Sequence, residues 1–148
     1  MTSDNSTMTN GAAVRRTFGI PRDLASWLQQ NMEGAPDLTR VRVYCGARLP
    51  FDWIPSFSRY VGLTLWNTIY LREPFHLDDA DSFELLFHEL VHVAQFQRGT
   101  FKFPLSYLWW LCVRGYLNHP AEIEARRIAA ECLAKFKTSA LYLQPQVR

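Results

Sequence analysis

Cysteine is scarce in this sequence, and its few copies are scattered. The three cysteines, Cys45, Cys112 and Cys132, are widely spaced and include no C-x-x-C pair. Their odd number and spacing argue against a disulfide framework and against a thiolate zinc site. We therefore expect three reduced, mostly buried thiols in a protein from a reducing compartment.

A large excess of charge of either sign is also missing. Lys and Arg number 16, Asp and Glu number 14, and the formal net charge is +2. A mixed, mildly basic surface lacks the electrostatic footprint of a nucleic-acid-binding protein. We therefore expect no nucleic-acid partner.

Long apolar runs are absent as well. No stretch reaches the roughly 18 continuous apolar residues of a membrane span. The polar N-terminus has no apolar segment ahead of Arg15 and Arg16, so it does not resemble a secretory signal. These absences predict a soluble, cytoplasmic protein with no membrane span, with export by a signal-independent route as the alternative.

Apolar and aromatic residues, in contrast, are plentiful. They make up 48% and 14% of the chain, which is enough for a packed core. The chain has the length of one domain. Residues 1–14 are rich in Ser, Thr and Asn and predict a disordered tail. We therefore expect a single domain over residues 15–148.

The first half of this domain is predicted to contain one helix and some strands. Pro21 suits the start of a short helix that closes near Gly34. Apolar residues alternate with polar ones over 41–45, which indicates a strand. Residues 46–58 are expected to form a loop, and the β-branched and aromatic segment 63–71 predicts one strand or one arm of a hairpin.

The second half is predicted to be helical. Aspartates within 78–81 favour the start of a helix that runs through 83–97, and Gly99 favours its end. A second, very apolar helix is expected over 103–116. A third helix is expected to be capped by Asn118 or His119, to begin at Pro120 and to run to about Lys137. A helix and strands followed by three helices predict an α+β fold, with strands packed on a helical half.

The segment FHELVHVAQ contains the motif H-E-x-x-H, formed by His88, Glu89 and His92. Four residues along an α-helix turn through about 400°, so both histidines project from one face, one turn apart. Two neutral imidazoles placed in this way can reach one zinc ion at about 2 Å. Glu89 leaves the helix about 100° from His88, so it lies beside the metal, where its carboxylate can act as a general base toward water.

The neighbours of the motif help to decide between a zinc site and two solvated histidines on a surface helix. Apolar residues at helical spacing form a stripe nearly opposite the histidines, namely Phe83, Leu86, Leu90, Val93 and Ala94. The histidines share their face with Asp81, Glu84 and Gln95. Apolar residues lie on the flanks of the helix, namely Leu85, Val91 and Phe96. Apolar flanks indicate a helix that is covered on more than one side, which favours the zinc site.

A catalytic zinc site usually has three protein ligands and one open position. The last predicted helix has a buried stripe made of Ala121, Ala125, Ile128, Ala129, Cys132 and Phe136. Glu122 falls at the edge of this stripe, whereas Glu124 falls outside it. A carboxylate near a buried face needs a partner, so Glu122 is our candidate for the third ligand. The alternative is a surface ion pair between Glu122 and Arg126.

These two motifs resemble those of the gluzincins, zinc peptidases in which H-E-x-x-H is followed by E-x-x-A on a second helix. More closely, HELVHVAQ and HPAEIEA resemble a bacterial zincin-like family of largely unknown function that carries HELxHVxQ and NPxExEA. The similarity covers roughly residues 45–135. It implies a minimal zincin-like domain, with a small sheet packed on an active-site helix and further C-terminal helices. It also implies one zinc ion per chain on His88, His92 and Glu122, with Glu89 as the base.

One position departs from the gluzincin pattern. Gluzincins often have Asp or Asn directly after the alanine of E-x-x-A, where it orients a ligand histidine, and this sequence has Arg126. Glu89 favours a zinc-dependent hydrolase that cuts peptide bonds. Arg126 and the small size favour a non-catalytic zincin-like domain that binds zinc structurally and mediates a protein interaction. A metal-free interaction module would require the motif to be accidental.

Other residues are candidates for further roles. His119 is expected to cap its helix, with a role as oxyanion donor or replacement zinc ligand as the alternative. Tyr116 is a second candidate for the oxyanion donor, with a core or rim aromatic residue as the alternative. His76 is expected to lie in a loop.

Two segments suggest binding surfaces. The strand 66–71 resembles the edge strand that lies above the site in zincins and pairs with an extended peptide substrate, with an ordinary sheet strand as the alternative. The apolar segment 103–116, with Trp109 and Trp110, is expected to be a core helix. Its alternative is an exposed patch for a protein partner or a membrane surface, although Arg114 as its only internal charge argues against a basic membrane-binding face.

Overall fold

The computed structural model describes residues 16–46, 48–53, 60–99 and 119–143. Several predictions lie outside these ranges: the tail over 1–14, the apolar helix over 103–116 with Trp109, Trp110, Cys112 and Arg114, and the role of Tyr116. They stay predictions. The described ranges contain the H-E-x-x-H motif and the helix that carries Glu122.

Capping residues mark the starts of the two long helices. The helical elements are α1 (Arg22–Asn31), the short 3-10 turn η1 (Leu38–Arg40), α2 (Ala80–Gln97), α4 (Pro120–Lys137) and α5 (Ala140–Leu143). The carboxylate of Asp79 accepts hydrogen bonds from the backbone N–H groups of Asp81 and Ser82 at the start of α2. His119 caps α4, and Pro120 opens it. The predicted starts of both helices are confirmed. None of the helices in the described ranges is long and apolar enough to cross a membrane.

Four short strands form one mixed sheet. They are β1 (Arg16–Phe18), β2 (Arg42–Cys45), β3 (Gly62–Leu65) and β4 (Thr68–Leu71), and their order across the sheet is β1-β2-β4-β3. β2 runs parallel to β4, whereas β1 and β3 are antiparallel to their neighbours. The strand predicted over 41–45 is therefore confirmed as β2.

The segment 63–71 differs from its prediction, because it contains both arms of a hairpin. The two arms, β3 and β4, meet at a turn where Trp66 has a φ of +54°, a left-handed conformation that ends the extended run. The interpretation of 66–71 as the edge strand is therefore wrong. β4 lies between β2 and β3, and β3 forms the edge on that side of the described sheet. β1 was not predicted, because three residues are too few to show alternation.

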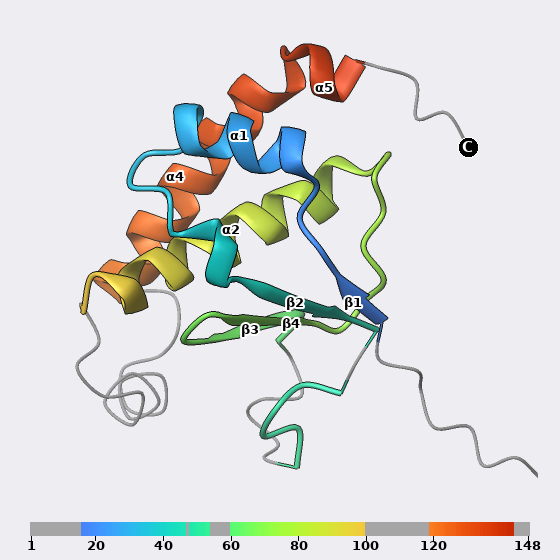
Figure 1. The fold of residues 1–148 in the computed structure, drawn as a ribbon. Helices are drawn as coiled ribbons and strands as arrows, with labels where there is room; N and C mark the ends of the chain where they lie inside the picture. The colour runs from blue at the N-terminus through green and yellow to red at the C-terminus, as the bar shows by residue number, and fades with distance from the viewer. Residues whose placement is uncertain (1–15, 47, 54–59, 100–118, 144–148) are drawn as a thin grey trace, which may run out of the picture.

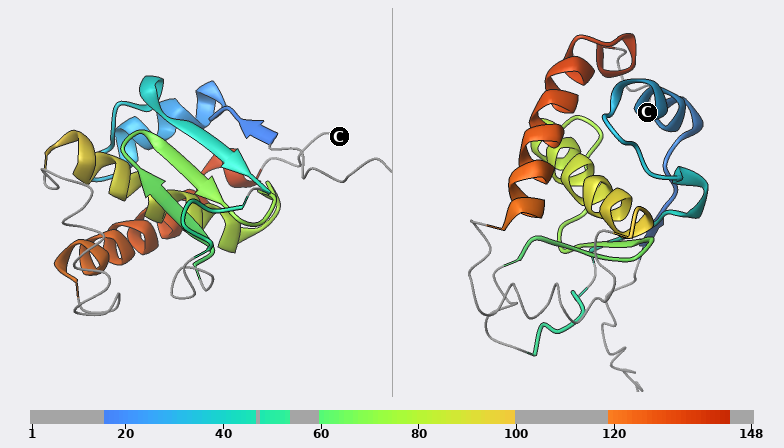
Figure 2. Two further views of the ribbon diagram at one scale, coloured as in Figure 1. Left: turned by 90° about the horizontal axis from the view of Figure 1, so that it is seen from below. Right: turned by 90° about the vertical axis from the view of Figure 1, so that its left-hand side faces the viewer.

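α2 is the central helix of the molecule (Figure 1). It contacts β3 and β4 on one side and α4 on another. Figure 2, in its left view, shows the strands in front of the helices, so the helices gather on one face of the sheet. The domain is therefore of the α+β class, with strands packed on a helical half, as predicted.

The predicted apolar stripes of α2 and α4 are buried. The five stripe residues of α2 are at most 3% exposed, and the six of α4 are at most 7% exposed. Near the start of α2 and the end of α4, four rings pack in stacked, tilted and edge-to-face pairs, and we refer to them as the aromatic cluster: Trp27, Phe83, Phe87 and Phe136. This cluster anchors one end of the α2–α4 contact, and polar side chains occupy the other end.

Candidate metal centre

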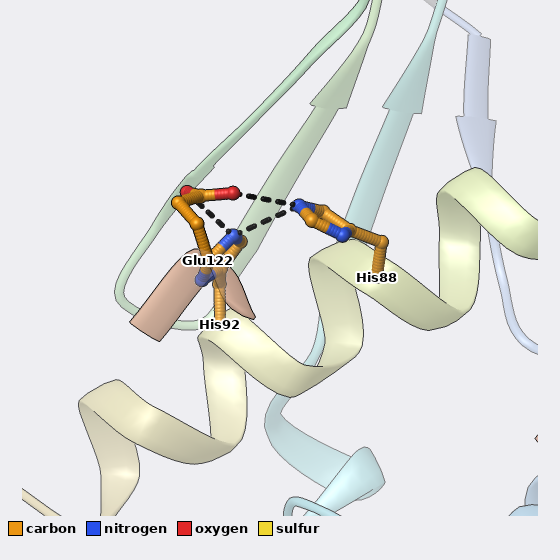
Figure 3. A group of neighbouring side chains, drawn as sticks. All are labelled: His88, His92 and Glu122. Carbon is orange, nitrogen blue, oxygen red and sulfur yellow. Dashed lines mark hydrogen bonds and ion pairs between the residues drawn. The ribbon is translucent and has the colours of Figure 1, made fainter. Parts of the chain in front are cut away.

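The two histidines of the motif lie one turn apart on α2 and turn their rings to the same side (Figure 3). Their Nε2 atoms are 3.1 Å apart. His92 is only 3% exposed, and the side chain of His88 is 12% exposed. The alternative of two solvated histidines on a surface helix is therefore wrong. One imidazole is fully enclosed, and the other reaches the protein surface.

Glu122 enters the same space from the first turn of α4 (Figure 3). Its Oε1 lies 3.1 Å from Nε2 of His92, and its Oε2 lies 3.3 Å from Nε2 of His88. Glu122 is 1% exposed, so it lies inside the protein and not in a surface pair with Arg126, which is exposed. The choice of Glu122 over Glu124 as the carboxylate beside the histidines agrees with this geometry.

These three side chains lie close enough together to share one metal ion. Metal–ligand bonds of about 2.0–2.1 Å at tetrahedral angles place neighbouring ligand atoms about 3.3 Å apart. The two Nε2 atoms are 3.1 Å apart, and they lie 3.1 and 3.3 Å from two different oxygens of Glu122. One ligand atom taken from each of the three residues lies within 4.8 Å of the others. In the described part of the chain, His88, His92 and Glu122 are the one group of three or more His, Cys, Asp or Glu residues whose ligand atoms converge in this way. The cluster can therefore hold a metal ion.

The electrostatics of the cluster favour a bound cation. Burial by itself lowers the pKa of His92, but the hydrogen bond and the negative charge of Glu122, together with the charge of Glu89, raise that pKa above its ordinary value overall. Two carboxylates thus act on one enclosed imidazole. A proton or a metal cation at Nε2 of His92 relieves the excess of negative charge.

The described cysteines do not take part in this cluster. Cys45 and Cys132 are buried and free, as predicted. Burial raises the pKa of the Cys132 thiol to about 12 and also raises the pKa of Cys45. Both thiols are therefore protonated at neutral pH, which leaves them without the thiolate that binds metal ions.

Glu89 is buried beside the cluster and is held by the edge strand β3. Its Oε2 accepts a hydrogen bond of 2.6 Å from the hydroxyl of Thr64. A Cβ atom at Gly62 would lie 2.6 Å from Oε1 of Glu89, so only glycine leaves room for the carboxylate in this position. Glu89 does not belong to the converging group, in agreement with the prediction that it is no ligand.

Gln95 supports His92 from the opposite side. Its Oε1 lies 2.8 Å from Nδ1 of His92, and it is completely buried. Its Nε2 donates to the backbone oxygen of Ala121 at 3.0 Å and to Oε2 of Glu124 at 2.7 Å. A single side chain of α2 therefore contacts a histidine of the cluster and two residues of α4.

The remaining histidines have the structural roles that were expected of them. The Nδ1 atom of His119 accepts a hydrogen bond of 3.1 Å from the backbone N–H of Ala121, so His119 caps α4. His119 is not part of the converging group, and its role as oxyanion donor stays a prediction. His76 is exposed in the loop between β4 and α2.

Thr64, Gly62 and Gln95 are the residues around the cluster that the sequence did not single out. Gln95 had a usable signal, because it follows His92 by three residues and shares its helix face. Thr64 and Gly62 had none, since they lie on a strand about 25 residues before the motif. No protein-family model, curated protein or solved structure matches the chain in the comparisons with known proteins.

Proposed function

We propose that this protein is a zinc-dependent hydrolase of the zincin type that cuts peptide bonds, with Glu89 as its general base. The observation that carries the proposal is the convergence of His88, His92 and Glu122 beside a buried carboxylate that is not one of them. A purely structural metal site has no need of that carboxylate. A hydrolase needs it to take a proton from water.

The donor set supports zinc as the metal. Two imidazole nitrogens and one carboxylate oxygen are a frequent ligand set of catalytic zinc, and they leave a fourth position for water or substrate. Magnesium and calcium prefer sites made of oxygen ligands. The partial exposure of His88 favours access to the centre from that side.

The role of each side chain follows from its position. When bound, zinc would polarise a water molecule and a substrate carbonyl and lower the pKa of the water toward 7. Glu89 would take the proton from the water as its oxygen attacks the carbonyl carbon, and would pass that proton to the nitrogen as the C–N bond breaks. Thr64 would keep Glu89 turned toward the attacked bond by bonding its other oxygen.

A second candidate is a non-catalytic domain that uses zinc as a structural link. One observation favours it, because the converging side chains come from two helices, α2 and α4, which zinc would join. Structural zinc sites usually have four protein ligands, however, and the described cluster has three. We therefore favour the hydrolase.

The first test is the metal content of protein purified without added metal. We expect one zinc ion per chain in the wild type and none in the double variant His88→Ala/His92→Ala. Glu122→Ala should lose most of its zinc, and Glu84→Ala, an exposed position of the same helix, should keep all of it. Zinc retained by the double variant would exclude this site.

The second test separates catalysis from metal binding. Glu89→Gln preserves the shape of the side chain but removes the base, so zinc should stay bound while turnover falls by a factor of about a hundred or more. Glu84→Gln is the matched control and should leave turnover unchanged. The assay is cleavage of unfolded proteins or a broad peptide library. Equal rates in Glu89→Gln and wild type would exclude the hydrolase mechanism.

A further inference from the structure

The amide of Gln95 is oriented by two groups that can only accept hydrogen bonds. The backbone oxygen of Ala121 and the carboxylate of Glu124 lie 3.0 and 2.7 Å from one end of this amide. A carbonyl and a carboxylate both require a donor, so this end must be the NH2 group. The oxygen of the amide must then face His92.

This orientation determines where His92 carries its proton. The oxygen of Gln95 lies 2.8 Å from Nδ1 of His92, and an amide oxygen can only accept. Nδ1 must therefore be the protonated nitrogen. In the neutral ring, this leaves the lone pair on Nε2, which is the nitrogen that faces His88 and Glu122.

We propose that Gln95 is the positioning residue of the metal centre, which selects the tautomer of His92 that presents its Nε2 lone pair to the metal. This inference rests on the proposed function, because it assigns Gln95 to the same zinc site. When the ring nitrogen that does not bind the metal donates a hydrogen bond to an acceptor, this bond orients the ring of a ligand histidine and increases its basicity. Gln95 thus supplies this support to His92 from α2 itself.

Gln95 also positions the third ligand. The two residues of α4 to which it donates, Ala121 and Glu124, lie on either side of Glu122 in the sequence. These hydrogen bonds hold the first turn of α4 against α2 at the point where Glu122 approaches both histidines. One buried amide therefore orients one ligand directly and places another through its hydrogen bonds to the first turn of α4.

The test is the affinity of the protein for zinc, measured by competition with a chelating dye. Gln95→Met keeps the volume of the side chain but removes both polar ends, and we expect zinc to bind about 10- to 100-fold more weakly. Gln97→Met is the matched control. Gln97 lies two residues away on the same helix. Its hydrogen bonds are to Asp37 and Asn67, and neither of these residues belongs to the metal centre. This control should leave the dissociation constant for zinc unchanged, even if it lowers the melting temperature.

A measurement on the wild type tests the tautomer without any variant. In the zinc-loaded protein, long-range 1H–15N spectra of the histidine rings should show a proton on Nδ1 of His92 and none on Nε2. Zinc bound at Nδ1, or equal zinc affinity in Gln95→Met and the wild type, would overturn the role of Gln95 and leave the hydrolase proposal standing. A wild type that binds no zinc would instead overturn the proposed function itself.

Discussion

The two ends of the contact between α2 and α4 are built in opposite ways. At one end, Phe136 meets the rings of Phe83, Phe87 and Trp27 at centroid distances of 4.6, 5.5 and 5.1 Å. At the other end, the same two helices bury Glu89, His92, Gln95 and Glu122, each at most 4% exposed. The comparison separates a part of the molecule that stabilises the fold from a part that carries the candidate chemistry.

The two ends differ in how strongly their contribution to stability depends on every hydrogen-bond partner being present. Apolar burial is non-directional, and each buried ring contributes in proportion to its area. Buried polar groups stabilise only when their hydrogen bonds are made, and a lost partner leaves a costly unsatisfied group. We therefore expect changes in the aromatic cluster to affect stability alone, and changes at the polar end to affect stability and zinc binding or turnover together.

The largest effect on stability is expected from Phe136→Ala. Phe136 is 2% exposed and lies at the centre of the aromatic cluster, so its loss should lower the free energy of unfolding by about 3–5 kcal/mol. Urea denaturation monitored by circular dichroism measures this change. The zinc affinity of the folded variant should stay within about twofold of the wild type, because the substitution alters neither the proposed zinc ligands nor their hydrogen-bond partners. Phe136→Leu retains most of the volume and should cost less. A large loss of zinc affinity in Phe136→Leu would contradict the expectation that the aromatic cluster affects stability alone.

Removal of zinc should have the next largest effect. A zinc ion that binds only the folded state stabilises it by about 2.7 kcal/mol when free zinc is 100-fold above its dissociation constant. For a domain of this size, about 2–4 °C per kcal/mol corresponds to a fall of roughly 5–10 °C in melting temperature upon chelation. Differential scanning calorimetry with and without chelator measures it. The variant His88→Ala/His92→Ala should not respond to chelator. An unchanged wild-type curve after confirmed zinc removal would show that zinc does not link α2 to α4.

Thr64→Val should produce the smallest of these changes in stability. It replaces the hydroxyl that bonds Glu89 with a methyl group of similar shape, so the free energy of unfolding should fall by about 1–3 kcal/mol. Turnover should fall as well, because Glu89 loses the contact that orients it, while zinc content stays at one ion per chain. Thr64→Ser keeps the hydroxyl and should retain most of the wild-type rate. Equal rates in Thr64→Val and wild type would show that Thr64 does not position Glu89.

The helices could be predicted because their signals are local. Asp79 and His119 satisfy N–H groups within three residues of themselves, and the stripes of α2 and α4 repeat at the helical period. The hairpin of β3 and β4 could not be placed in the same way. Its two-residue turn consists of Trp66, which has no special preference for the left-handed conformation it adopts, and Asn67. Asn67 is a turn-favouring residue, but a single Asn within a run of β-branched and aromatic residues is a weak signal of a turn.

The edge of the sheet illustrates what local patterns cannot convey. Strand order depends on which backbones pair, and β4 pairs with β2, which precedes it by more than twenty residues. An alternating pattern identifies a strand but does not identify its neighbours. The edge was therefore assigned to the wrong arm of the hairpin, and β3 is the arm that contacts Glu89 through Thr64.

The sequence by itself determined the class of the fold, the long helices and the shared face of His88 and His92, because each depends on residues within a few positions of one another. It also indicated Glu122, since the helical period placed that carboxylate at a buried edge. Only the tertiary structure decided that Glu122 meets both histidines, that Thr64 holds Glu89, and that Gln95 joins His92 to α4. These contacts span 25 or more residues of sequence, and their partners become neighbours only when α2 is packed between the sheet and α4.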